Sequence, residues 1–328
     1  MRPQGSRHAV GRRHGAGSRT RRSLPGGTIV TTGPLTRRVA RDVLGVSGSD
    51  ARTYLQGQCS QDIDALAPGG SAESLVLSPQ GKVDGYVRIT RTGDESYVLD
   101  TDAGCGEAVR ARLERFRLRT KVDIETLAWS CRSVRGVPTP AIAVPDGPTL
   151  PLAVAWPGWE GIDLLGPTPG DDPELVAWMP DGAVPATEEE WEAARIEAGV
   201  PVGGREVTEA TIAAEVGLVD RTVSFTKGCF TGQELVARLD ARGSKVARRL
   251  WGLVVADGAR PPVGASVWTL DGEHEVGQLT SLAWSVDRGA TVALGTLHRR
   301  IEPPEVVDVR WDGGSAAAEV RPLPLLTG

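Results

Sequence analysis

Short hydrophobic runs that alternate with polar residues characterise residues 39–129. Within them, Val109, Leu113 and Phe116 recur at i, i+4 and i+7, the spacing of one helix face. A second short helix is predicted over Ser49–Gly57, with the serine as N-cap and the glycine as terminator. The other runs are rich in β-branched and aromatic residues and predict strands at 74–78, 85–91, 96–100 and 122–126. This pattern is typical of an α+β module.

The pattern changes twice further along the chain. Eleven of the 23 prolines lie in 138–185, which predicts short edge strands and surface loops. A helix follows, with Thr187 and Glu190 as a capping box and Gly199 as its end. After Gly243 five or so strands of even spacing predict a small β-barrel, at 250–255, 265–270, 276–284, 291–296 and 306–311.

These changes divide the chain into four parts. Residues 1–34 are predicted to form a disordered basic tail, 35–130 a first α+β module, 131–245 a second α+β module, and 246–328 the barrel. An over-extended start site or an organellar transit peptide would also explain the tail. We assign the tail no function.

The charge is distributed unevenly. The net charge is −5, yet seven arginines lie within residues 1–22. The chain has 37 basic and 42 acidic residues, so 30 basic residues remain against 42 acidic ones when these seven are left out. A body this acidic is not expected to bind nucleic acid directly, since such binding depends on neutralising phosphates.

Export and membrane signals are absent from the sequence. No apolar run reaches the roughly 18 residues of a membrane span, so we expect a cytoplasmic protein that makes no membrane contact. The four cysteines are Cys59, Cys105, Cys131 and Cys229, and no two of them form a C-x-x-C pair. The spacing therefore predicts no metal site formed by this chain alone. Because the chain shows no export signal, its thiols are expected to be reduced.

Cys229 has the most suggestive surroundings of the four. Thr231 and Glu234 are predicted to form a capping box for a helix over 232–241, and Lys227 is two residues away. A helix N-terminus and a nearby cation both stabilise a thiolate, so the pattern predicts a reactive or metal-competent thiol. The alternative is a small, inert, buried residue before a helix.

The segment Lys-Gly-Cys-Phe-Thr-Gly-Gln-Glu at 227–234, called the signature loop below, resembles the K-G-C-[YF]-x-G-Q-E motif of the YgfZ family. Further segments resemble other elements of this family or of the related aminomethyltransferase (T protein) of the glycine cleavage system. These segments are Tyr54–Gln58 (Y-L-Q-G-Q), Ser78–Lys82 (S-P-Q-G-K), Arg195–Pro201 with Gly204–Glu206, and Arg238–Gly243. The resemblance covers roughly residues 37–300.

The resemblance implies an aminomethyltransferase-like fold of three units, with two ferredoxin-like α+β modules around a central channel and a C-terminal β-barrel. It also implies a bound tetrahydrofolate and a role in assembling or repairing iron-sulfur proteins, some of which modify tRNA. The expected partners are folate and iron-sulfur client or carrier proteins. A cluster would be held transiently, shared with a partner through Cys229.

The same resemblance assigns roles to individual residues. Glu197 matches the carboxylate that holds the pterin ring, and two parallel hydrogen bonds to a 2-amino-pyrimidinone edge suit a carboxylate. Cys229, assisted by Lys227, is the expected reactive centre. Further residues expected at the folate or beside the thiol are Arg195, Arg238 and Lys82 for the glutamate carboxylates, Gln233 to orient Cys229, and Asp84. Each of them could instead be an ordinary surface residue.

Enzymatic activity is left open. The transferases carry paired aspartates at two positions where this chain, aligned on Gly81, has Gly85 and Tyr86. The only acidic residue adjacent to these positions is Asp84. An accessory factor is therefore preferred to a folate-dependent aminomethyl or methyl transferase that would use Asp84. A plain folate-binding or interaction module with an inert Cys229 is the third hypothesis.

Overall fold

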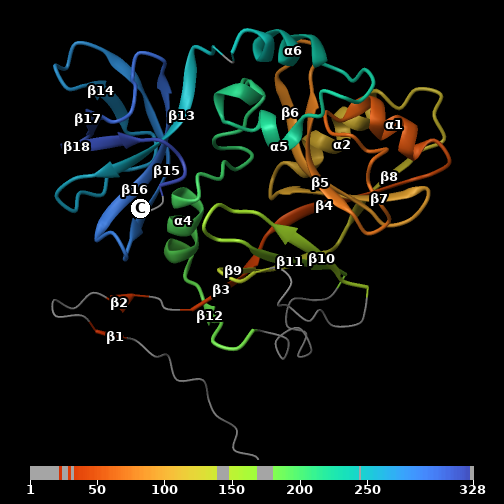
Figure 1. Cartoon of the computed structure of the whole chain (residues 1–328), viewed down its shortest axis with the longest axis horizontal. Helices are drawn as coiled ribbons and strands as arrows, with labels where there is room; N and C mark the ends of the chain where they lie inside the picture. Colours follow the sequence, from red (N-terminus) through yellow and green to blue (C-terminus); the bar gives the residue numbers. More distant parts are fainter. Residues whose placement is uncertain are drawn as a thin grey trace, which may run out of the picture.

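The computed structural model describes residues 22–23, 29–30, 33–138, 148–167, 180–243 and 245–325. A closed β-barrel occupies one end of the elongated molecule, and two five-stranded sheets occupy the other (Figure 1). This confirms the predicted α+β class with a C-terminal barrel. Of the predicted tail, the structure describes β1 (Arg22–Ser23) and β2 (Ile29–Val30), which pair with each other. The rest of residues 1–32 lies outside the described part.

The first sheet has the order β5-β6-β7-β4-β8 and its paired strands are antiparallel. Helices α1 and α2 pack against it, and Leu55, Val87, Leu99 and Leu113 are among the buried residues of their common core. The bounds are β4 Arg41–Ser47, α1 Ala51–Gln58, β5 Ser71–Leu77, β6 Val83–Arg91, β7 Ser96–Asp102, α2 Gly106–Arg115 and β8 Asp123–Leu127.

The second sheet has the order β10-β11-β9-β3-β12. Its strand β3 precedes the whole first sheet in sequence and pairs with β9, so the second sheet includes a strand from the start of the chain. The bounds are β3 Leu35–Val39, β9 Ser130–Arg135, β10 Leu150–Val154, β11 Gly161–Gly166 and β12 Val184–Pro185. Helix α4 (Glu188–Glu197) then lies between this sheet and the barrel (Figure 1).

Six strands close the barrel in the order β13-β16-β15-β14-β17-β18. The strand β18 was not predicted, because its run of small residues lacks the β-branched and aromatic signal. The bounds are β13 Arg248–Val255, β14 Ser266–Thr269, β15 Glu275–Ser285, β16 Ala290–His298, β17 Glu305–Trp311 and β18 Gly314–Arg321.

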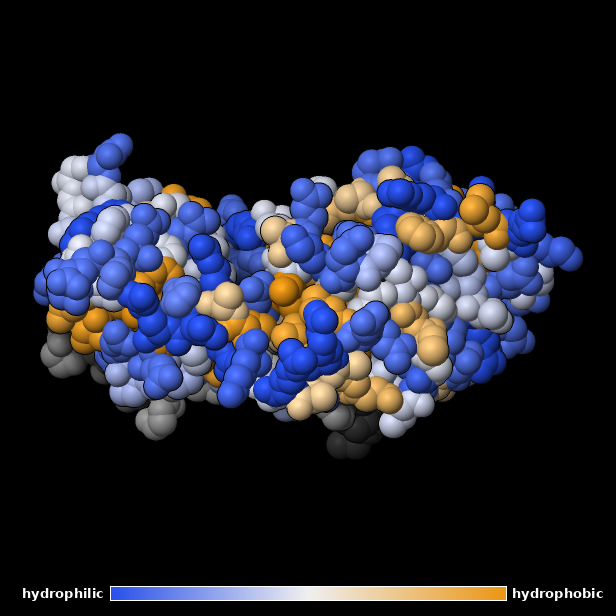
Figure 2. Space-filling view, turned by 90° about the horizontal axis from the view of Figure 1, so that it is seen from above, coloured by the Kyte–Doolittle hydropathy of each residue, from blue (hydrophilic) through white to orange (hydrophobic). Residues whose placement is uncertain are grey.

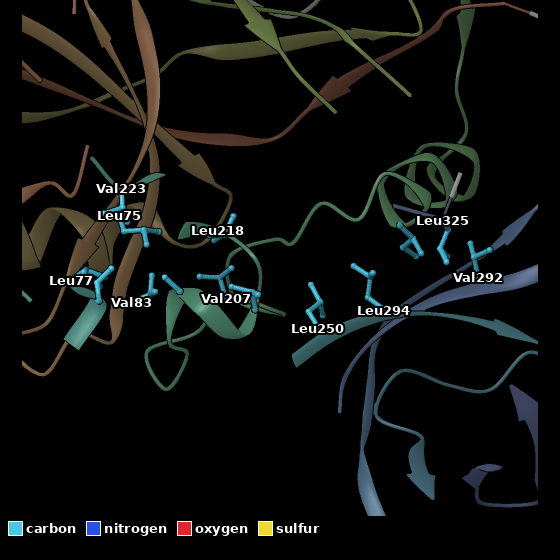
Figure 3. Packing of buried hydrophobic residues seen from close by; sticks show 14 of the residues in the cluster. Leu75, Leu77, Val83, Val207, Leu218, Val223, Leu250, Val292, Leu294 and Leu325 are labelled. Carbon is cyan, nitrogen blue, oxygen red and sulfur yellow. The ribbon is translucent and has the colours of Figure 1, made fainter. Parts of the chain in front are cut away.

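One apolar cluster joins the barrel to the first sheet. Leu75, Leu77 and Val83 of that sheet and Leu250, Val292 and Leu294 of the barrel belong to it. Residues of the connecting segment fill the space between them (Figure 3). That segment holds the 3-10 helix η2 (Ala213–Glu215), α5 (Val219–Thr222) and α6 (Gln233–Ala241). Because apolar residues from three parts of the chain bury one another here, the position of the signature loop is fixed against both ends. The expected central channel stays a prediction.

The predicted helix caps had mixed outcomes. The capping box of Thr187 and Glu190 is confirmed. The predicted box of Thr231 and Glu234 is wrong, because Gly232 is the N-cap of α6 and has a left-handed φ of 82°. The predicted N-cap Ser49 is also wrong, since α1 begins after Asp50 and continues past Gly57 to Gln58. No helix among the described residues is long and apolar enough to cross a membrane.

Candidate functional site

Lys227 fastens the signature loop to the first module. Its ammonium nitrogen donates to the backbone carbonyl oxygens of Gln56, Cys59 and Gln61 at 2.6, 2.7 and 2.8 Å. An ammonium has three protons, so each can be used by one of these oxygens. Burial lowers the pKa of Lys227. The side chain therefore holds residues 56–61 and the signature loop together.

Backbone contacts continue this attachment. The Thr231 amide donates to the Gly57 carbonyl at 3.2 Å, and the Ser224 amide donates to the Ser60 carbonyl at 3.0 Å. Inside the loop, the Gln233 side-chain oxygen accepts from the Phe230 amide at 3.1 Å and ties the start of α6 to the residues before it. The signature loop and the Y-L-Q-G-Q segment, far apart in sequence, thus form one structural unit.

The S-P-Q-G-K turn also belongs to this unit. A Cβ on Gly232 would lie 2.5 Å from the Ser78 carbonyl oxygen and 2.7 Å from the Leu77 Cβ. A Cβ on Gly81 would lie 2.5 Å from the Cβ of Leu235 in α6. Both glycines have positive φ, so each is required by conformation as well as by contact. Three segments singled out in the sequence therefore meet at one place.

Cys229 is the exposed thiol of this unit. Cys59 and Cys131 are buried and Cys105 is half-buried. Burial raises the pKa of the Cys59 and Cys131 thiols to about 12, which keeps them protonated at neutral pH. Within the described residues, no three His, Cys, Asp or Glu side chains are grouped in a way that could hold a metal ion. Cys229 is thus the one cysteine that a partner can reach freely.

Asp84 and Lys82 lie on the edge of the same region. Arg112 of α2 donates to the Asp84 carboxylate at 2.9 Å, to Gln58 at 3.1 Å and to the Leu77 carbonyl at 2.8 Å. Arg112 therefore connects α2 to Asp84 of β6 and to Gln58 at the end of α1. Lys82 is exposed and makes no ion pair with a described carboxylate.

Glu197 lies at the end of α4, against the barrel. Ser285 donates to its Oε1 at 2.7 Å and Arg288 donates to the same oxygen at 3.0 Å. Arg288 also donates to the Leu325 carbonyl, and the Leu325 amide donates to the Glu197 carbonyl at 2.7 Å. Both side-chain bonds end on Oε1, and none of the described residues donates to Oε2.

Arg195, on the same helix, is 3% exposed and its donors are already in use. It donates to Ser281 and to Glu192, each at 2.6 Å, and to the Val200 carbonyl, and it lies 3.5 Å from Glu206. Ser281 in turn donates to Glu206 at 2.6 Å. The guanidinium therefore ties α4 to the barrel strand β15.

Similar proteins agree with this architecture. Residues 248–326 match the glycine cleavage T-protein C-terminal barrel domain. The chain is 28% identical over 298 residues to the tRNA-modifying protein YgfZ of Klebsiella pneumoniae (strain 342), covering 85% of this chain and 89% of that protein. It is 26% identical over 300 residues to the tRNA-modifying protein YgfZ of Escherichia coli O157:H7, with the same coverage of 85% and 89%. The chain is thus similar to YgfZ proteins over most of its length.

The fold has a solved counterpart as well. The glycine cleavage system aminomethyltransferase T from Bartonella henselae matches with a TM-score of 0.76 and 19% identity, over 90% of this chain and 86% of that one. At this identity the likeness concerns the fold alone. The predicted YgfZ resemblance and the aminomethyltransferase-like fold are both confirmed.

Within this aminomethyltransferase-like fold the predicted site residues fall into two groups. The first group lies around the signature loop, which carries Lys227, Cys229 and Gln233. Lys82 and Asp84 belong to it because they lie on neighbouring segments that contact the loop or residues 56–61. Glu197 and Arg195 form a separate group between α4 and the barrel. Arg238 is exposed on α6 and makes no ion pair with a described carboxylate.

A buried ionic network between the two sheets was not predicted from the sequence. Arg88 of β6 donates to Asp100 at 2.9 and 3.0 Å and to Asp163 of β11 at 2.9 Å. Arg135 of β9 pairs with Asp163 at 2.9 Å, and Arg41 of β4 donates to Asp100 at 2.8 Å. The linear pattern does not indicate this network, because its charged side chains come together only when the two sheets pack against each other.

Proposed function

We propose that this chain is a cytoplasmic tetrahydrofolate-binding accessory factor that assists the assembly or repair of iron-sulfur proteins through Cys229. The supporting observation is that Cys229 is exposed while Lys227 and Thr231 on either side of it are fastened to residues 56–61. A thiol held outward on an anchored loop suits a partner protein that approaches from solvent.

The cysteine inventory supports a shared cluster. Iron-sulfur clusters are held by several thiolates, and here Cys59 and Cys131 are buried away from solvent. The remaining cluster ligands would therefore come from a client or carrier. Because the relatives are called tRNA-modifying proteins, we propose that the clients include enzymes that modify tRNA.

The folate part of the proposal depends on Glu197. Its Oε2 can accept from a pterin amino or ring N–H group, while Ser285 and Arg288 fix Oε1. Among the predicted anion-binding residues, Lys82 and Arg238 are exposed and have no carboxylate partner among the described residues, whereas Arg195 is fully engaged. Lys82 and Arg238 are thus the better candidates for the glutamate carboxylates.

Two measurements test the folate-binding part and the Cys229 part of the proposal separately. Calorimetric titration with tetrahydrofolate should show binding by the wild type and by Cys229→Ser, and a loss of at least about tenfold in Glu197→Ala. In cells that lack the protein, Cys229→Ser should fail to restore the activity of a cluster-dependent tRNA-modifying enzyme, while the matched variant Cys105→Ser should restore it. Equal rescue by both cysteine variants would exclude the thiol role, and no folate binding by the wild type would exclude the folate role.

A second candidate is aminomethyl or methyl transfer to folate, which the fold of the aminomethyltransferase favours. Asp84 would be its acidic residue. The ion pair with Arg112 at 2.9 Å already gives Asp84 a structural partner. Formation of methylene-tetrahydrofolate from an aminomethyl donor, lost in Asp84→Asn, would favour this candidate over the accessory role.

A further inference from the structure

Two segments give the molecule a local charge opposite to its net charge. Residues 238–249 and 298–300 carry seven basic residues and one acidic residue, a net charge of +6 in a chain whose net charge is −5. We call them together the basic edge. The first segment joins α6 to β13 along the upper side of the molecule in Figure 1, the side that faces the viewer in Figure 2. The low overall charge therefore conceals a concentrated positive region.

The barrel brings the two segments together. Arg248 of β13 is paired across the ladder with His298 of β16. The Arg299 amide donates to the Ala247 carbonyl at 2.9 Å, which places Arg299 and Arg300 directly beside the end of the first segment. Cross-strand neighbours have Cβ atoms about 5 Å apart. The two segments are thus adjacent at the ends of β13 and β16.

Most of these charges have no carboxylate partner within the described part of the chain. Five exposed cations of the basic edge make no ion pair with a described carboxylate, namely Arg242, Lys245, Arg248, Arg299 and Arg300. Asp271 lies within electrostatic reach of Arg300, and its carboxylate accepts hydrogen bonds from Thr269 and the Glu273 amide. Unpaired cations crowded on one surface repel one another, so an anionic partner stabilises them.

Contrary to the expectation from the acidity of the whole body, we propose that the basic edge binds the phosphate backbone of RNA. Four of the five unpaired cations are arginines, whose planar fork matches phosphate oxygens. The Arg249 guanidinium lies over the Trp251 ring, 5.8 Å from its centroid, and such planes stack on the unpaired bases found in folded RNA.

An acidic protein fits this surface less well. Protein interfaces depend on a core of buried apolar or aromatic anchors. The exposed large apolar side chains of the described chain are Leu118, Phe225, Val263, Leu270 and Val306, and all five lie outside the two segments. A cationic surface without such anchors suits a polyphosphate, whose binding is dominated by release of counterions.

The test is fluorescence anisotropy with the full chain and a labelled tRNA transcript at several salt concentrations. The triple variant Arg248→Gln, Arg299→Gln, Arg300→Gln should weaken binding at least about tenfold and reduce the slope of log K against log salt by about two to three, since each arginine neutralises one phosphate. The matched control replaces Arg38, Arg115 and Arg119, three exposed arginines elsewhere, and should leave binding nearly unchanged. Duplex DNA of similar length should bind more weakly than the transcript.

Several results would overturn the proposal. The seven arginines of residues 1–22 could bind RNA by themselves, so the same comparison is repeated with those arginines replaced by serine. If the triple substitution then has no effect, or if both triple variants lose affinity equally, the basic edge is not the site. Polyglutamate competing as well as tRNA would assign the surface to an acidic protein. Ultraviolet crosslinking of the wild type to tRNA, read by mass spectrometry, should map to residues 242–249 and 299–300, and crosslinks elsewhere alone would also exclude the site.

Discussion

The ammonium nitrogen of Lys227 lies 2.6 Å from the carbonyl oxygen of Gln56, and the carbonyls of Cys59 and Gln61 complete its surroundings. The lysine that sequence analysis placed beside a reactive thiol is therefore occupied as a bridge between two segments. Since Cys229 is two residues away, this bridge anchors the backbone close to the exposed thiol. The structure gives Lys227 a positioning role, whatever else it contributes to the chemistry of Cys229.

Lys227→Met should lower the free energy of unfolding by about 2 to 4 kcal/mol, because it removes charge-assisted hydrogen bonds and leaves three carbonyl oxygens without their donor. Urea denaturation measures this. Lys82→Met is the matched control, since Lys82 is exposed and has no described carboxylate partner, and it should change stability by less than about 0.5 kcal/mol. Equal effects of the two substitutions would show that the carbonyl contacts do not stabilise the fold.

Much of the fold was accessible from local pattern, and the site was accessible only in part. Alternation and turn residues predicted most strands of the first sheet and barrel, and the capping box of Thr187 was visible because its partner Glu190 is three residues away. By contrast, β3 pairs with β9 almost a hundred residues later, and no local pattern encodes that choice. The motifs showed which segments mattered, but only the tertiary structure shows that they touch.

Gly232→Ala should destabilise the protein more than Gly217→Ala does. Both glycines have positive φ, 82° and 68°, so both alanines adopt a strained backbone. Only at Gly232 would the new Cβ meet neighbours, 2.5 Å from the Ser78 oxygen, whereas nothing lies within 4 Å at Gly217. We expect a difference of about 1 to 3 kcal/mol in the free energy of unfolding, the usual cost of overpacking. A difference near zero would mean that the signature loop and the Ser78–Lys82 turn are not tightly packed.

Thiol titration of the native protein with an aromatic disulfide reagent should show one fast equivalent. Cys229 is exposed, Cys105 is half-buried, and Cys59 and Cys131 are at most 1% exposed. Reaction requires access of the reagent to sulfur, so the buried thiols should react only after unfolding. Cys229→Ser should remove the fast phase and Cys105→Ser should leave it. A fast phase that survives in Cys229→Ser would contradict the exposure of Cys229.

The ionic network between the sheets predicts a specific dependence on acid. Burial alone would raise the pKa of Asp163, but Arg135 and Arg88, together with the hydroxyl of Ser133, hold it well below its usual range. Its pKa is thus lower in the folded state than the roughly 3.9 of an unfolded chain. The unfolded state then takes up the proton first as the pH falls, so the stabilisation by Asp163 is complete above about pH 5 and declines below about pH 4.

Asp163→Asn should therefore destabilise the protein by about 3 to 5 kcal/mol at pH 7, because it leaves the buried guanidinium of Arg135 without its carboxylate. The difference in the free energy of unfolding between the variant and the wild type, called the gap below, should narrow as the pH falls from about 5 toward 2. Over that range the wild-type carboxylate becomes protonated in the unfolded state, so its stabilising effect declines. Denaturation curves at a series of pH values measure the gap. Asp123→Asn, at a side chain 94% exposed, is the control and should show almost no gap at any pH. A gap for Asp163→Asn that stays constant down to pH 2 would mean that its charge does not stabilise the contact between the two sheets.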